Sequence, residues 1–295
     1  MKLLITGSNG LLGQKLVKLC IRYGYDFIAC SRGENRNPDC PSDRYVELDI
    51  ANKLAVNHLF QSWYPSHVIH TAAITNVDYC ELHPEECRRI NVEGSKNLFD
   101  ASMRYQAHFQ LLSTDFVFDG EDGPYDEDAP VNPLSTYARS KAESEQLLIN
   151  SDYSNWSIVR TIIVIGTASG LSRSNMVLWV KKSLEQGEHI RVVNDQFRMP
   201  TWADDLAWGC LQICSLSERG IFHLSGKDFV SMLEFAYQIA DYYQLDRSLI
   251  SPVRSEELKQ AAKRPPKTGF ILDKAITRLG YRPKSIAEFL ELMPE

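Results

Sequence analysis

The sequence predicts an α/β fold in which one parallel sheet carries helices on both faces. Short apolar runs alternate with amphipathic stretches through the first two-thirds of the chain, and a glycine-rich turn follows the first apolar run. At 295 residues the chain can bury a full core, as one large domain or two closely joined ones. We therefore predict a doubly wound sheet with a smaller second lobe.

Each predicted strand is a short apolar run, and each predicted helix repeats apolar residues three or four positions apart. The strands are expected at residues 2–6, 26–31, 44–47, 67–71, 108–113 and 156–160. The helices between them are expected at 11–23, 51–63, 84–105 and 137–150. Because strands and helices alternate, the strands should run parallel.

The pattern loosens from about residue 166. Helical segments near 175–186 and 232–243 are separated by loops that contain Gly and Pro, and an Arg-Pro-Pro-Lys stretch at 264–267 interrupts the chain again. We expect a first domain over 1–165, to which a segment near 200–216 returns. Residues 166–295 should form the smaller, partly interleaved C-terminal lobe.

Bulk properties exclude several classes of protein. A net charge of −6 argues against nucleic-acid binding, and no apolar run reaches the roughly 18 residues that span a membrane. Seven cysteines without a C-x-x-C pair predict reduced, buried thiols in a cytoplasmic protein. Too few ligands lie near Cys210 and Cys214 for a zinc site, so no metal is expected.

A nucleotide site is predicted where the first strand ends. Gly7, Gly10 and Gly13 form a Gly-x-x-Gly-x-x-Gly turn into a helix, which lets the backbone approach a pyrophosphate at the helix N-terminus. A flexible N-terminal turn is the alternative, but the strand before and the helix after favour a Rossmann-type dinucleotide site. The remaining residues of this predicted cradle are Ser8, Asn9, Leu11 and Leu12.

The second strand should end beside the adenosine ribose. It ends at Arg32 with no carboxylate before Glu34, which favours NADPH; a solvated loop arginine would leave NADH open. Two further pairs are expected to contact the cofactor: Asp49 and Ile50, near the adenine, and Ala72 and Ala73, at the end of the fourth strand. Asp49 could equally cap the next helix.

A chemical site is predicted on the helix that begins near Tyr137. Lys141 lies four residues further on and shares the same helix face. Its ammonium would favour the phenolate and bring the pKa of the phenol closer to neutral pH. A surface Tyr-x-x-x-Lys is common. However, Thr114 ends the fifth strand, where open α/β sheets bind ligands, and its hydroxyl could reach the same carbonyl oxygen.

These motifs resemble the extended short-chain dehydrogenase/reductase family, and within it the dTDP-4-dehydrorhamnose reductases. The resemblance covers nearly the whole chain. It is carried by residues 6–13, 72–78, 113–120, 137–141, 160–161 and 195–207, of which Thr-Asp-Phe-Val-Phe-Asp-Gly at 114–120 and the Gln-x-x-x-Pro-Thr stretch at 196–201 are the more specific.

The resemblance implies reduction of a 4-keto-deoxy sugar carried on a nucleoside diphosphate, with hydride from NADPH. Tyr137 would protonate the alkoxide, Thr114 would hold the oxygen, Lys141 would tune Tyr137, and Asp115 would lie beside them. The substrate would be bordered by Thr75, Val77, Asp78, Gln196, Arg198 and Thr201. Arg198 could reach the diphosphate. A homodimer is compatible with this assignment.

One departure from the family pattern bears on the substrate. After Arg160-Thr161 the sugar reductases carry Ser-Trp, with the tryptophan against the substrate, whereas this chain has Ile162-Ile163. Two alternatives stay open beside the reductase. A sugar-nucleotide epimerase is one; dehydration is disfavoured because Phe116 stands where related dehydratases have a glutamate. The other is a non-catalytic subunit similar to the regulatory β subunit of methionine adenosyltransferase.

Overall fold

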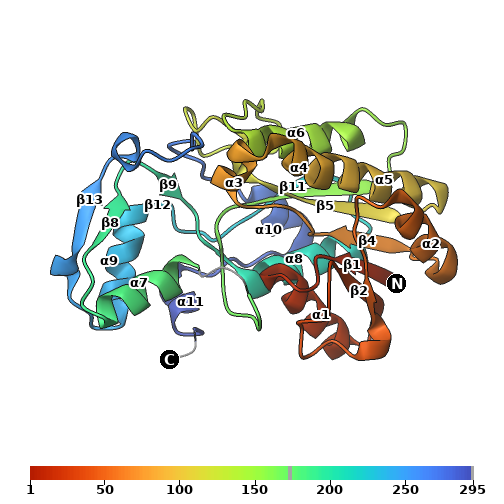
Figure 1. Cartoon of the computed structure of the whole chain (residues 1–295), viewed down its shortest axis with the longest axis horizontal. Coiled ribbons are helices and arrows are strands. Elements are labelled where there is room, and N and C mark those ends of the chain that lie inside the picture. The colour runs from red at the N-terminus through yellow and green to blue at the C-terminus, as the bar shows by residue number, and fades with distance from the viewer. Residues whose placement is uncertain (172–174, 294–295) are drawn as a thin grey trace.

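The computed structural model describes residues 1–171 and 175–293, and a seven-stranded parallel sheet forms its centre (Figure 1). The strand order is β11-β6-β5-β4-β1-β2-β3, which confirms the predicted doubly wound class. The strands are β1 (Lys2–Thr6), β2 (Asp26–Ser31), β3 (Tyr45–Glu47), β4 (His67–His70), β5 (His108–Thr114), β6 (Trp156–Thr161) and β11 (Gly220–Leu224).

Helices cover both faces of this sheet. On one face lie α1 (Leu11–Tyr23), α8 (Ala203–Ser215) and α10 (Asp273–Leu279), whose apolar residues share one core with the sheet. On the other lie α2 (Lys53–Trp63), α5 (Gly94–Arg104) and α6 (Thr136–Ile149). Apart from the edge strand β3, which is partly exposed, the strands are thus shielded from water on both sides, which is why their sequences read as mainly apolar runs.

The long helix predicted at 84–105 is interrupted. It consists of α4 (Pro84–Arg88), the π-helical turn η2 (Arg89–Glu93) and α5. Within the turn, buried Asn91 exchanges hydrogen bonds with the backbone of Ile74 and also donates to Ser140 Oγ, at 3.0 Å. The π turn therefore fixes the loop after β4 against α6, a tertiary contact that apolar periodicity does not reveal.

The smaller lobe packs around its own apolar core (at the left of Figure 1). It contains α7 (Met176–Glu185), α9 (Met232–Tyr242), α11 (Ile286–Leu290) and the parallel pair β8 (Ile190–Val193) and β13 (Ile250–Val253). Two further pairs join β7 (Val164–Ile165) to β10 (Thr201–Trp202) and β9 (Phe197–Arg198) to β12 (Val230–Ser231).

The chain crosses between the two parts more than once. After β10, α8 packs against α1, and β11 then adds an edge strand to the central sheet beside β6. The sequence analysis did not identify β11, because its short apolar run lies among the irregular segments of the C-terminal half. The domain boundary at residue 165 stays a prediction. Residues beyond it, those of β11, complete the central sheet.

The remaining short elements are α3 (Val77–Leu82) and the 3-10 turns η1 (Ser42–Arg44), η3 (Asp115–Val117), η4 (Arg247–Leu249) and η5 (Ser255–Leu258). All seven cysteines are buried, and none of them forms a disulfide within residues 1–171 and 175–293. No helix within residues 1–171 and 175–293 has the length and apolar character to cross a membrane. The expectation of no metal stays a prediction.

Candidate active site

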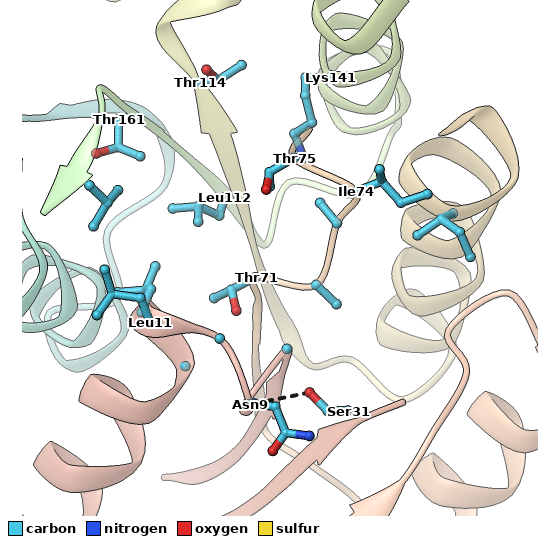
Figure 2. Close-up of a pocket in the computed structure, with 18 of the residues that line it drawn as sticks. Asn9, Leu11, Ser31, Thr71, Ile74, Thr75, Leu112, Thr114, Lys141 and Thr161 are labelled. Carbon is cyan, nitrogen blue, oxygen red and sulfur yellow. Dashed lines mark hydrogen bonds between the residues drawn. The ribbon is translucent and has the colours of Figure 1, made fainter. Parts of the chain in front are cut away.

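A cavity of about 1050 Å³ lies at the carboxyl ends of the central strands. β1 lies between β2 and β4 there, so the chain connections after neighbouring strands run in opposite directions. This switch point is where doubly wound sheets bind ligands. Figure 2 shows Asn9 and Ser31 at one end and Thr114 and Lys141 at the other. The predicted residues in its lining are Gly7, Asn9, Gly10, Leu11, Leu12, Gly13, Arg32, Asp49, Ile50, Ala72, Ala73, Thr75, Val77, Thr114, Asp115, Tyr137 and Lys141.

The glycine turn leaves no room for side chains. A Cβ on Gly13 would lie 2.3 Å from the carbonyl oxygen of Gly7, and Gly7 has a φ of +71°. No side chain caps the N-terminus of α1 at Gly10, and the fully buried Ser8 hydroxyl has no partner among the described residues. Close backbone approach and unused donors fit the pyrophosphate of a dinucleotide.

Asn9 connects this turn to the loop after β2. Its backbone N–H donates to Ser31 Oγ at 3.1 Å and its side-chain amide donates to the Glu34 carbonyl at 2.8 Å. Its side-chain oxygen accepts from the Arg36 N–H at 2.8 Å. Both Arg32 and Arg36 line the cavity at this end. The sequence analysis passed over Arg36, although a second arginine four residues after the first was a usable signal.

The other predicted cofactor residues lie between the two ends. Asp49 lines the cavity and also accepts a hydrogen bond from the Ala51 N–H at 2.9 Å, so it closes the turn before α2. The helix cap itself is Asn52, whose side chain accepts from the backbone of the first turn. Ala72 and Ala73 follow β4 and present little bulk to the cavity.

Thr114 and Tyr137 meet at the opposite end. Ser135 caps the N-terminus of α6, which places Tyr137 in the first turn of the helix, facing β5. Burial raises the pKa of the Tyr137 phenol well above its usual value; its hydrogen bond with the Thr114 hydroxyl lowers the pKa, and the Asp115 carboxylate raises it. A buried phenol that keeps its proton at neutral pH is equipped to act as a general acid.

Lys141 lies one turn along α6 from Tyr137 and is almost fully buried. Burial lowers the pKa of its ammonium to about 8, against the opposing effect of the Glu145 carboxylate. Lys141 does not figure among the causes that set the pKa of Tyr137, so tuning of the phenol by this lysine stays a prediction. At pH 7 Lys141 is a cation at the wall of the cavity.

Several residues predicted for the substrate side have other partners. Asp78 forms an ion pair with Arg264 at 2.7 Å, and the Gln196 amide donates to Ser255 Oγ at 2.8 Å. The fully buried Thr201 hydroxyl donates to the Ile162 carbonyl. These residues, with Ser8 and Arg198, lie outside the cavity lining, whereas Thr75 and Val77 belong to it. The Gln-x-x-x-Pro-Thr motif thus packs between the two parts of the chain.

The cavity also contains residues that the sequence analysis did not select. They include Ser31, Arg36, Thr71, Ile74, Leu112, Phe116, Thr161, Val164, Asn175 and Met176. Several follow the ends of β4, β5 and β6, so their position at strand ends was the available signal. Ile163 lines the cavity with a φ of +27°, which a β-branched residue rarely adopts. It forms an aliphatic wall where the family pattern has tryptophan.

Comparisons with known proteins agree with this geometry. The chain is 32% identical over 290 residues to "Spore coat polysaccharide biosynthesis protein SpsK" of Bacillus subtilis (strain 168), covering 98% of this chain and 95% of that protein. It is 31% identical to a dTDP-4-dehydrorhamnose reductase of Aggregatibacter actinomycetemcomitans, covering 96% and 94%. It is 30% identical to methionine adenosyltransferase 2 subunit beta of Xenopus tropicalis, covering 86% and 75%.

Two solved structures are similar over nearly the full chain. One is a dTDP-4-dehydrorhamnose reductase of Clostridium acetobutylicum, with 31% identity, a TM-score of 0.86 and coverage of 99% and 98%. Another is a dTDP-4-dehydrorhamnose reductase of Bacillus anthracis in complex with NADP, with 30% identity, a TM-score of 0.85 and coverage of 99% and 97%. A model of the RmlD substrate binding domain matches residues 1–293. The chain therefore belongs to the RmlD substrate-binding-domain family, as its motifs indicated.

Proposed function

We propose that this protein is an NADPH-dependent reductase of a nucleotide-activated 4-keto-deoxy sugar. The observation that carries the proposal is that Tyr137, Thr114 and Lys141 together line one end of a cavity whose other end is the glycine turn. Full-length similarity to dTDP-4-dehydrorhamnose reductases, one of them in complex with NADP, supports the same assignment.

The described residues suit the two ends of such a cofactor. The backbone around Gly10 would hold the pyrophosphate, and Arg32 and Arg36 would face the 2′-phosphate. Bound NADPH would supply the hydride to the C4 carbonyl carbon. Lys141, cationic at pH 7, would hold the ribose next to the nicotinamide.

The chain's own residues would handle the proton. As the carbonyl gains electrons its oxygen becomes an alkoxide. The Thr114 hydroxyl, whose one proton is otherwise donated to Asp115, would donate it to that oxygen in a hydrogen bond. Tyr137 transfers its phenolic proton to that oxygen and leaves a phenolate, which Thr114 and nearby Lys141 then face. One hydride and one proton convert the ketone into an alcohol. Phe116 lines the same wall and has no transferable proton.

Turnover of purified protein with a panel of dTDP-, GDP- and UDP-4-keto-6-deoxy sugars tests this proposal. NADPH consumption with one class, accompanied by formation of the corresponding 4-hydroxy sugar, is the expected result. If the protein binds NADPH but reduces none of these sugars, the proposal is wrong.

A second function is favoured by one specific observation, the 30% identity to methionine adenosyltransferase 2 subunit beta. Under that alternative the chain would bind the dinucleotide without turnover. Thr114, Tyr137 and Lys141 all line the cavity, which supports the enzyme. We further propose that it acts in the cytoplasm, in keeping with its seven buried cysteines, which are reduced in the described structure. Light scattering of purified protein tests the expected homodimer.

A further inference from the structure

A buried ion pair lies directly behind the proposed catalytic hydroxyl. Asp115 follows Thr114 at the end of β5, and its carboxylate lies 3.6 Å from Arg198 Nε. Both side chains are nearly inaccessible to water, with exposed fractions of 3% and 1%. Burying two charges is costly unless further hydrogen bonds satisfy both of them. The partners of this pair therefore indicate what it holds together.

Arg198 is held by the backbone of the C-terminal half. Its guanidinium donates to the carbonyl oxygens of Phe197, Pro265 and Pro266, at 2.7, 2.6 and 3.1 Å. Both terminal nitrogens of the guanidinium are bonded to these carbonyl oxygens, and Arg198 is not among the residues that line the cavity. In this geometry Arg198 serves as a cross-link between β9 and segment 265–268.

Asp115 is held from the same segment and in turn holds Thr114. One carboxylate oxygen accepts a hydrogen bond from the Thr268 hydroxyl, and the other accepts from the Thr114 hydroxyl at 3.1 Å. Thr268 is fully buried, and its backbone N–H donates to the Phe197 carbonyl at 3.3 Å. A continuous polar chain thus runs from segment 265–268 through Asp115 to the Thr114 hydroxyl, which lines the cavity together with Tyr137.

We propose that Arg198 and Thr268 are positioning residues that fix Asp115, and through it the Thr114 hydroxyl, in line with Tyr137. This inference rests on the proposed reductase function. Both contacts from the C-terminal half are to the same oxygen of Asp115, Oδ2, which leaves Oδ1 to accept the hydrogen bond from Thr114. The catalytic hydroxyl is therefore in place only while segment 265–268 is docked on the central sheet.

Thr268→Val tests the inference, because valine keeps the shape of threonine and removes only the hydroxyl. We expect kcat to fall roughly 10- to 100-fold, as expected for a reacting group displaced by less than an ångström or so, with the dissociation constant for NADPH unchanged. Thr268→Ser, which retains the hydroxyl, should restore kcat to near the wild-type value. Thr277→Val, on the exposed face of α10, is the matched control and should leave kcat unchanged.

Arg198→Lys provides an independent variant should Thr268→Val fail to fold. Lysine keeps the charge beside Asp115, but its single nitrogen cannot bond the carboxylate and the three carbonyls together, so kcat should again fall. Wild-type kcat in folded Thr268→Val or Arg198→Lys would overturn the inference. So would an equal loss in Thr268→Ser, or a parallel loss of NADPH binding. An inactive wild-type protein would overturn the proposed function itself, together with this role.

Discussion

At the scale of single residues, the decisive feature is that the proposed chemical groups are buried and still line the cavity. Tyr137, Thr114 and Lys141 are each less than one-tenth exposed, yet each reaches the cavity. Desolvation raises the pKa of the phenol and lowers that of the ammonium, so both neutral forms are favoured relative to water. Three predictions follow from individual side chains.

Removing the phenolic hydroxyl in Tyr137→Phe should lower kcat by a factor on the order of 10² to 10⁴, the usual contribution of one acid–base group. The ring would still pack against Phe116, so the fold and the NADPH dissociation constant should change little. Steady-state kinetics and a fluorescence titration with NADPH measure both. Retained turnover in the variant would remove Tyr137 from the mechanism.

Arg32→Ala and Arg36→Ala should each weaken the binding of NADPH far more than that of NADH. Only NADPH carries the 2′-phosphate that an arginine guanidinium can bind. KM values for the two cofactors, compared variant by variant, give the result. Arg191→Ala, at an exposed site of β8, is a charge-matched control. Parallel losses for both cofactors would show that these arginines do not distinguish them.

Turnover should decline as the pH rises through about 8. Burial lowers the pKa of Lys141 to about 8, so its ammonium is present below that pH and is lost above it, together with its attraction for the phenolate. A profile of kcat/KM against pH measures this limb. An active Lys141→Arg variant should shift the decline upward, because arginine stays protonated; a limb at the same pH would assign it to another group.

At the scale of elements, the cofactor end of the cavity depends on backbone proximity. The start of α1 lies so close to the turn that a Cβ added at Gly13 would clash with the carbonyl oxygen of Gly7. Asn9 then fixes the loop after β2 by bonding both Glu34 and Arg36. β1, the glycine turn, α1 and the loop after β2 therefore form one local unit, and its close packing depends on the absence of a side chain at Gly13.

Gly13→Ala should destabilise the unliganded protein by about 3 kcal/mol, because the added Cβ would lie 2.3 Å from a backbone oxygen that cannot move aside. Gly10→Ala is the matched comparison, since its Cβ would lie 3.2 Å from the same atom and could be accommodated. Thermal unfolding without cofactor distinguishes them. Equal melting temperatures would contradict the packing argument.

At the scale of the whole molecule, buried charges hold distant parts of the chain together. The Arg160 guanidinium in β6 forms a 2.7 Å ion pair with Glu145 in α6, with exposed fractions of 2% and 1%. Glu145 also accepts from Ser113 at the end of β5, and Arg160 contacts the Glu127 carbonyl. This cluster joins the helix that carries Tyr137 to the sheet, whereas the Asp115–Arg198 pair joins the end of β5 to the C-terminal half.

Glu145→Gln should lower the free energy of unfolding by roughly 3–5 kcal/mol, because Arg160 would keep a buried charge without its counterion. The double variant Glu145→Gln, Arg160→Met should recover part of this loss, since no charge is left unpaired. Urea denaturation of both variants measures the difference. A single variant as stable as wild type would show that water reaches Arg160.

Apolar periodicity and glycine spacing determined the doubly wound class, six of the seven strands and the two ends of the cavity. These features follow from local physics: buried parallel strands must be apolar, and a pyrophosphate turn must lack side chains. Tertiary structure alone decided the π turn at Asn91, the seventh strand β11 and the partners of Arg198. Each depends on residues far apart in the chain, so the direction of a side chain such as Arg198 is settled only when both halves have packed.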